Sequence, residues 1–166
     1  MGKIKFLFII LFGILAFSAC EKDDICIGAD TPQIVIRFYD ILDTTQSKDV
    51  QNLLVRGLDD MGAREDSIPN IALDSIVLPL RPNRTSTSFI LQRIVNINDT
   101  RSIDTLTFSY EPREVFASRA CGYIVNYDNL QASLTETDPD SLWIKGITID
   151  STHIENSAAT HVRIFH

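Results

Sequence analysis

At residues 103–110 the chain contains the stretch Ile103-Asp104-Thr105-Leu106-Thr107-Phe108-Ser109-Tyr110, in which apolar and polar side chains alternate. The apolar members, expected on one face, are Leu106, Phe108 and Tyr110. The polar members, expected on the other face, are Thr105, Thr107 and Ser109. Because successive side chains of a β-strand point to opposite faces, the alternation predicts a half-buried strand. We expect it to end at Glu111-Pro112, since proline cannot donate a ladder hydrogen bond.

Working outward, eight further segments have the length and composition of strands. They are residues 33–39, 50–57, 74–80, 85–95, 115–127, 130–135, 143–149 and 161–165. Short strands separated by polar turns, without a sustained helical period, predict an all-β fold. We expect an antiparallel β-sandwich of the immunoglobulin or transthyretin kind, with a β-barrel as the alternative.

The connections between these segments carry their own signals. Residues 59–70 are rich in acidic side chains and predict a long connection. Pro79 indicates that the strand over 74–80 lies at a sheet edge. Residues 156–160 are the nearest approach to a helical turn.

Length and charge limit the classes of partner. The chain has 166 residues and a net charge of −7. Lys3 and Lys5 lie in an expected leader that has no acidic residue, so its removal leaves 13 basic against 22 acidic residues, a net charge of −9. Such a balance argues against nucleic acid as a partner, because phosphate neutralisation needs excess Lys and Arg. The mature length fits one domain.

The first 19 residues predict a secretory signal peptide. A short basic start is followed by an apolar run at 6–17, and then by the small residues Ser18 and Ala19. This order is typical of a cleaved signal, and the run is shorter than a membrane span of about 20 residues. Cys20 directly after the small pair resembles the bacterial lipobox, although Phe17 departs from the usual pattern. We therefore expect cleavage before Cys20 and lipid on its thiol; the alternative is an ordinary signal.

The residues after Cys20 suggest where in the cell envelope the protein is located. Glu21-Lys22-Asp23-Asp24 resembles the export signal that sends lipoproteins of Bacteroidetes to the outer face of the outer membrane. The alternative is a solvated spacer facing the periplasm. We expect residues 20–32 to form a lipid-anchored tether and residues 33–166 to form the single β-sandwich domain.

Cys26 and Cys121 form an even pair once Cys20 is assigned to the anchor. Disulfides persist outside the cytoplasm, so we expect a bond between them; two buried thiols are the alternative. The bond would close a loop of roughly 95 residues.

One three-residue pattern occurs six times: Asp, then Ser or Thr, then an apolar residue or Thr. The amino-acid composition alone would predict roughly one such triplet. It resembles the O-glycosylation sequon of secreted proteins of Bacteroidetes. The candidate acceptors are Thr44, Ser67, Ser75, Thr105, Ser141 and Ser151. The alternative is turn chemistry, because Asp, Ser and Thr hydrogen-bond nearby backbone groups.

No catalytic motif stands out, and we expect no cofactor and no metal. Nucleophile-elbow, phosphate-loop and zinc-protease patterns are missing from the sequence. The three histidines, expected to be exposed or capping, are His153, His161 and His166. The acidic side chains in 59–66 could bind calcium, but a solvated loop is the simpler interpretation. Trp143 is expected in the core rather than against a sugar.

Several blocks resemble a family of flavobacterial lipoproteins known as a domain of unknown function. They are Cys26, Thr31-Pro32, Ile36-Arg37-Phe38-Tyr39-Asp40, Leu78-Pro79-Leu80 and Ser118-Arg119-Ala120-Cys121-Gly122-Tyr123. The resemblance implies a cell-envelope lipoprotein with two recurring cysteines, and it implies no activity. We expect a non-enzymatic binding or structural module with an envelope protein or glycan as partner. The alternatives are a hydrolytic or glycan-handling enzyme, favoured by a His and a carboxylate converging in a cleft, and a small-ligand carrier.

Replacing Cys20 tests the anchor. The variant Cys20→Ala should move the protein from the membrane fraction to the soluble fraction, because the acyl chains bury many methylene groups at about 0.8 kcal/mol each. Immunoblotting of fractionated cells measures this, and protease added to intact cells expressing the unmodified protein should cleave it. Retention of the variant in membranes would refute lipidation, and protection from protease would place the domain inside the envelope.

Overall fold

A computed structural model describes residues 25–26, 28–59, 64–93, 102–135 and 142–166, without the side chains of 64–71. The described residues contain nine strands and no helix, so the predicted all-β fold is confirmed. The strands are β1 (Ile34–Tyr39), β2 (Val50–Leu58), β3 (Arg64–Leu73), β4 (Ser75–Leu78), β5 (Ser86–Arg93), β6 (Ser102–Ser118), β7 (Gly122–Thr135), β8 (Gly146–Ile149) and β9 (Val162–Phe165).

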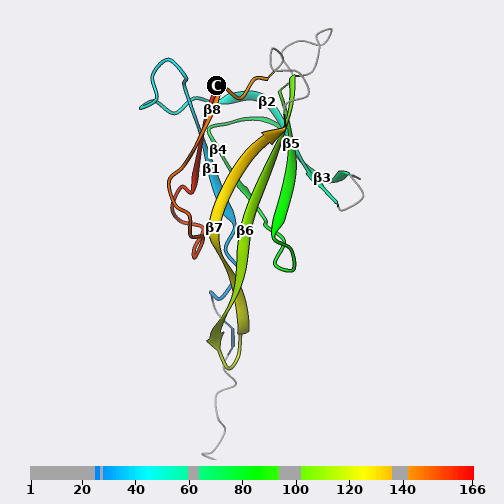
Figure 1. Cartoon of the computed structure of the whole chain (residues 1–166), viewed down its shortest axis with the longest axis vertical. Helices are drawn as coiled ribbons and strands as arrows, with labels where there is room; N and C mark the ends of the chain where they lie inside the picture. Colours follow the sequence, from blue (N-terminus) through cyan, green and yellow to red (C-terminus); the bar gives the residue numbers. More distant parts are fainter. Residues whose placement is uncertain (1–24, 27, 60–63, 94–101, 136–141) are drawn as a thin grey trace, which may run out of the picture.

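The strands form two sheets (Figure 1). One sheet has the order β4-β1-β9-β8 and the other has the order β3-β2-β5-β6-β7. Neighbouring strands run antiparallel with one exception: β1 lies parallel to β9. The expected edge position of the segment before Pro79 is confirmed, because β4 is the outer strand of its sheet.

The core is filled from the facing sides of both sheets. Leu106 and Phe108 of β6 are fully buried, as their alternation predicts, and Phe108 packs edge-on against Phe89 with ring centroids 6.2 Å apart. From the other sheet, Ile36 and Phe38 of β1 are equally buried and belong to the same apolar cluster. Packing of two apolar sheet faces therefore holds the layers together.

Trp143 lies in this core, as expected. Its side chain is buried and its indole N–H donates to the Leu91 carbonyl at 3.2 Å. Two of the histidines, which were expected to be exposed or capping, are buried: His161 and His166. His161 nevertheless caps the backbone, because its Nδ1 accepts a hydrogen bond from the Val35 amide at 3.0 Å. His166 packs edge-on against the Trp143 ring with centroids 5.7 Å apart.

The expected break at Glu111-Pro112 is wrong, because β6 continues through Pro112 to Ser118. The pairing of β6 with β5 ends at Ser109, so at Pro112 the side of β6 that faced β5 has no neighbouring strand to hydrogen-bond. Proline is tolerated at such an edge position because no hydrogen bond is lost. A single strand over 115–127 is also wrong: residues 119–121 form a turn, and β7 begins at Gly122, which has a φ of 70°.

As a result, β6 and β7 form a long hairpin that extends beyond both sheets (Figure 1). We call residues 111–128 of this hairpin the arm, and its turn lies at the lower end of the view, far from the C-terminus. The segment predicted as 130–135 is the far half of β7 rather than a separate strand.

The predicted disulfide joins Cys26 to Cys121 at the tip of the arm, with Cα atoms 4.8 Å apart. From Cys26 the chain runs back along the arm towards β1. On the way, the Val125 amide of β7 donates to Thr31 Oγ1 at 3.3 Å. The disulfide thus fixes the segment before β1 to a hairpin that lies 95 residues away in sequence.

The acidic connection expected over 59–70 is in large part a strand, β3, which pairs antiparallel with β2. It is the outer strand of its sheet, and its pairing shifts register at several points. Residues 64–71 lack the strict alternation of a half-buried strand, so the sequence did not indicate this pairing. Pro69 fits the same position, because one side of an edge strand has no ladder. Residues 156–160 form bends rather than a helical turn.

Removing the disulfide should destabilise the protein. For Cys121→Ser we expect the free energy of unfolding to fall by about 4 kcal/mol, because closing a long loop restricts the unfolded chain. Denaturant titration with and without reductant measures this. The neighbouring variant Ala120→Ser is the control and should lose stability only when reductant is added. Equal stability of Cys121→Ser and the unmodified protein would contradict the prediction.

Asp104 shares the buried face of β6 with Leu106, and the sequence interpretation did not place it in the core. Its carboxylate is fully buried, where Oδ2 accepts the Ile144 amide at 2.8 Å. Oδ1 has no hydrogen-bond partner in the described part of the chain. Burial raises the pKa of Asp104 above its ordinary value of 3.8, and the Ile144 hydrogen bond offsets only part of that effect.

The raised pKa has a consequence for stability that Asp104→Asn tests. Since the folded chain retains the Asp104 proton to higher pH than the unfolded chain, this group stabilises most below pH 3.8 and its contribution is lost as pH rises through the raised pKa. The stability of Asp104→Asn relative to the unmodified protein should therefore increase from pH 4 towards pH 7, measured by denaturant titration across roughly that range.

Asp40→Asn provides a control of opposite sign. The Leu42 amide lowers the pKa of Asp40, so its contribution is present above its ordinary pKa and is lost on acidification. A pH-independent difference for Asp104→Asn would contradict the assignment.

Candidate functional site

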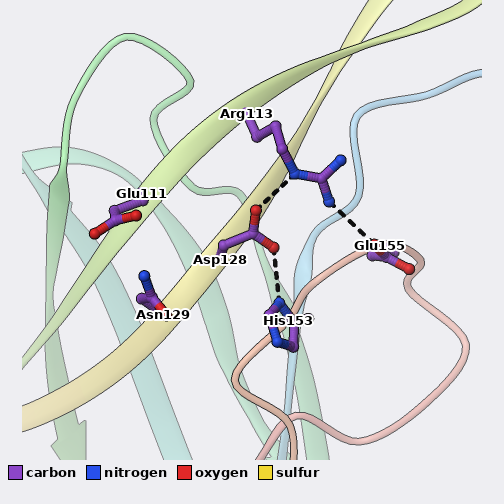
Figure 2. Close-up of a pocket in the computed structure, with 6 residues that line it drawn as sticks. All are labelled: Glu111, Arg113, Asp128, Asn129, His153 and Glu155. Carbon is purple, nitrogen blue, oxygen red and sulfur yellow. Dashed lines mark hydrogen bonds and ion pairs between the residues drawn. The ribbon is translucent and has the colours of Figure 1, made fainter.

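An open polar hollow of 560 Å³ lies at the base of the arm (Figure 2). Six side chains from three parts of the chain line it: Glu111, Arg113, Asp128, Asn129, His153 and Glu155. Two come from β6, two from β7 and two from the connection between β8 and β9. Segments far apart in sequence therefore build one surface.

A β-bulge shapes the β7 wall. Ser109 pairs with Gln131, but Glu111 pairs with Asp128, so β7 carries one extra residue between these pairs. Asn129 lies in this interval and has a φ of 55°, in the left-handed region that asparagine tolerates better than most residues. Bulges redirect neighbouring side chains, and this one turns Asp128 and Asn129 into the hollow.

The connection between β8 and β9 docks against the outer edge of β7. Ile154 and Tyr127 exchange backbone hydrogen bonds of 2.8 and 3.1 Å, and the Leu130 amide donates to the Thr152 carbonyl at 3.0 Å. Ile154 is fully buried. Because side chains alternate in extended backbone, His153 and Glu155 on either side of Ile154 point towards the hollow.

Asp128 is the centre of the site (Figure 2). Its Oδ2 accepts Arg113 Nε at 2.6 Å, and its Oδ1 lies 2.7 Å from His153 Nδ1. Arg113 also donates to Glu155 Oε1 at 3.1 Å. The hydrogen bond from Arg113, followed by that from His153, lowers the pKa of Asp128. Asp128 is therefore an ionised carboxylate at neutral pH, and because an ionised carboxylate only accepts hydrogen bonds, His153 donates to it from Nδ1.

The rest of the hollow is rich in acceptors. Glu111 and Asn129 have no hydrogen-bond or ion-pair partner among the described residues, and both side chains are exposed. Three carboxylates face one guanidinium and one imidazole, so the acidic side chains outnumber the basic ones in the hollow. Chemically, it suits a polar ligand that donates hydrogen bonds or carries positive charge.

The residues predicted as sites lie elsewhere. The disulfide cysteines Cys26 and Cys121 are at the arm tip. Cys20 and the export signal at 21–24 lie outside the described residues, as do the side chain of Ser67 and all of Ser141. Asp60 likewise lies outside the described residues, and the side chains of Glu65 and Asp66 are not described. The described part of the chain contains neither a group of three or more His, Cys, Asp and Glu side chains placed to bind a metal nor a helix able to span a membrane.

Four candidate glycosylation residues are described. Thr44 is exposed, whereas Ser75, Thr105 and Ser151 are half-buried. The preceding aspartates have structural contacts: Asp43 accepts the Thr45 amide at 3.1 Å, Asp74 accepts the Ser75 hydroxyl at 2.9 Å, Asp104 caps Ile144, and Asp150 pairs with Arg163 at 2.7 Å. Local turn and strand chemistry accounts for these aspartates, and glycosylation of the hydroxyls stays a prediction.

Sequence reasoning missed the hollow. Of its six residues, only His153 was considered as a candidate site residue; it was expected to be exposed or capping, and its side chain is 60% exposed. Arg113 and Glu155 are separated by 42 residues, and no spacing rule joins them. The usable signal was Asn129 within a strand, where asparagine is uncommon and often marks a bulge.

A comparison of the sequence with models of known protein families found a match. Residues 52–166 match the model described as "Family of unknown function (DUF6452)". The chain belongs to this family. The match extends from within β2 to the end of β9, so DUF6452 includes the arm and every residue of the hollow, whereas β1 and Cys26 precede the matched region. None of the curated proteins and none of the solved structures matches the chain.

Proposed function

We propose that this DUF6452 protein is a lipid-anchored envelope protein of the bacterial outer membrane that acts as a non-enzymatic binding module. The predicted signal peptide, Cys20 and the acidic export signal support an outer-membrane location. We favour the outer, cell-surface face of that membrane. The Cys26–Cys121 disulfide fits the same compartment, because such bonds persist outside the cytoplasm. The resemblance to flavobacterial lipoproteins supports the same origin.

We further propose that the two sheets form a sandwich of the immunoglobulin or transthyretin kind. Two layers of four and five strands with a shared apolar core support this assignment. Sandwiches of this kind commonly serve as binding modules that present side chains at their ends and edges.

The hollow at the base of the arm is the proposed binding surface. The observation that carries this proposal is the Arg113–Asp128–His153 chain of contacts, which fixes three side chains while Glu111 and Asn129 stay available. Preorganised polar groups lose little conformational entropy when a ligand binds. Hydroxyl groups of a glycan and basic side chains of an envelope protein are donors that match these acceptors.

The variant Glu111→Gln tests this surface. It removes one negative charge and preserves shape, so retention of a donor-rich ligand should fall by about tenfold if one charged hydrogen bond is lost. Immobilised protein can be challenged with envelope glycans and with solubilised envelope proteins, and the bound fraction compared with that on Glu114→Gln. Glu114 is an exposed acid of the same strand outside the hollow. Equal retention by both variants would exclude the hollow as the binding surface.

A hydrolytic or glycan-handling enzyme is the second candidate, because a histidine and a carboxylate do converge here. His153 Nε2 could act as a general base oriented by Asp128. Against this, the hollow is open, and Asp128 is neutralised by Arg113 rather than held in a dry site where its charge would orient His153 strongly. Turnover of an envelope glycan that is lost in His153→Ala and retained in Glu114→Gln would favour the enzyme.

A further inference from the structure

Two exposed aromatic rings lie at the tip of the arm, beside the disulfide. Phe116 and Tyr123 are cross-strand partners, and their rings pack edge to face with centroids 5.5 Å apart at 68°. Phe116 is 56% exposed and Tyr123 is 68% exposed. Ile25, which precedes Cys26, is 79% exposed. We call Ile25, Phe116 and Tyr123 the tip surface.

The tip surface is held in place rather than left to fluctuate. The disulfide ties Cys26 to Cys121, two residues before Tyr123, and so keeps Ile25 at the same end of the arm. The Cys121 amide donates to Ser118 Oγ at 3.0 Å, which closes the turn. Apolar side chains fixed in an exposed position normally mark a contact surface.

Charge distinguishes the tip from the rest of the chain. Residues 115–124 contain Arg119 and no acidic residue, although the chain has 22 acidic residues. Acidic side chains resume at Glu114 on β6 and Asp128 on β7, both further along the arm. Between Glu114 and Asp128 the hairpin therefore has no carboxylate beside the rings, although Glu21, Asp23 and Asp24 precede Ile25 in the sequence.

The proposed anchor would bring this surface close to a bilayer. Cys20 precedes Cys26 by six residues, and six extended residues span at most about 20 Å. If Cys20 carries lipid, as proposed above, the arm tip therefore lies close to the lipid headgroups. This step rests on the proposed lipid anchor. Aromatic rings with a polar edge, such as Tyr123, favour the membrane–water interface.

We propose that the tip surface contacts the bilayer that carries the anchor, with Phe116, Tyr123 and Ile25 at the level of the headgroups. The arm then stands as a spacer between the membrane and the two sheets. From Ser118 to Glu111 the strand rises roughly 23 Å, so the hollow faces the solvent well above the headgroups. The lipid and the tip together give two attachment points, which orient the domain instead of leaving it to swing on a single chain.

Tryptophan fluorescence in vesicles tests the contact. The lipidated full chain carrying Tyr123→Trp is reconstituted into vesicles of phosphatidylethanolamine and phosphatidylglycerol, with or without bromine on the acyl chains. The brominated lipid should quench the new tryptophan, because its bromines collide only with rings at the membrane. Trp143 is buried in the core and gives a constant background.

Leu42→Trp is the matched control. Leu42 is 92% exposed and lies in the connection between β1 and β2, which Figure 1 shows at the opposite end of the molecule from the arm tip. Its tryptophan should keep its emission in brominated vesicles.

Co-sedimentation with the vesicles is measured on the same samples, so the two proposals fail separately. Sedimentation without quenching of Tyr123→Trp would overturn the tip contact and leave the anchor intact. If, in addition, chemical cross-linking finds dimers that Phe116→Ser abolishes, a second copy of the chain covers the tip and the bilayer contact is wrong. Failure to sediment would overturn the anchor and the inference together, whereas sedimentation with quenching confined to Tyr123→Trp supports both.

Discussion

The antiparallel ladder between β6 and β7 is the interaction on which the rest of the structure depends. At one end it lies within the five-stranded sheet, where β5 flanks β6 and Phe108 reaches the core. At the other end it leaves the sheet as a two-stranded ribbon. Such a ribbon is only marginally stable alone in water. It persists here because its strands continue out of a packed sheet and because a disulfide closes its tip.

The same ladder creates the polar hollow. An extra residue in β7 opposite Tyr110 bends the strand at the point where the arm leaves the sheet. The connection between β8 and β9 covers the outer edge of β7 there through backbone hydrogen bonds. Covering an edge protects it from pairing with other chains, and in this protein it also supplies His153 and Glu155. The backbone contacts that hold this edge of the fold thus also position the side chains of the candidate site.

The molecule has two chemically different ends along its arm. The base of the arm gathers carboxylates around Arg113 and His153, whereas residues 115–124 at the tip include the exposed rings of Phe116 and Tyr123 and no acidic side chain.

Local sequence determined the features that depend on neighbours along the chain. Alternation at 103–110 and 34–39 predicted strands, since one buried face imposes a period of two. Compartment and number predicted the pairing of Cys26 with Cys121. By contrast, Pro112 suggested a break that did not occur, because only the tertiary arrangement shows that β5 has already ended beside it. The edge strand β3 was not predicted because residues 64–71 lack the strict alternation of a half-buried strand. The burial of Asp104 and the meeting of Arg113, Asp128 and Glu155 were likewise decided in three dimensions, because a charged side chain carries no local sign of the partner that folding brings to it.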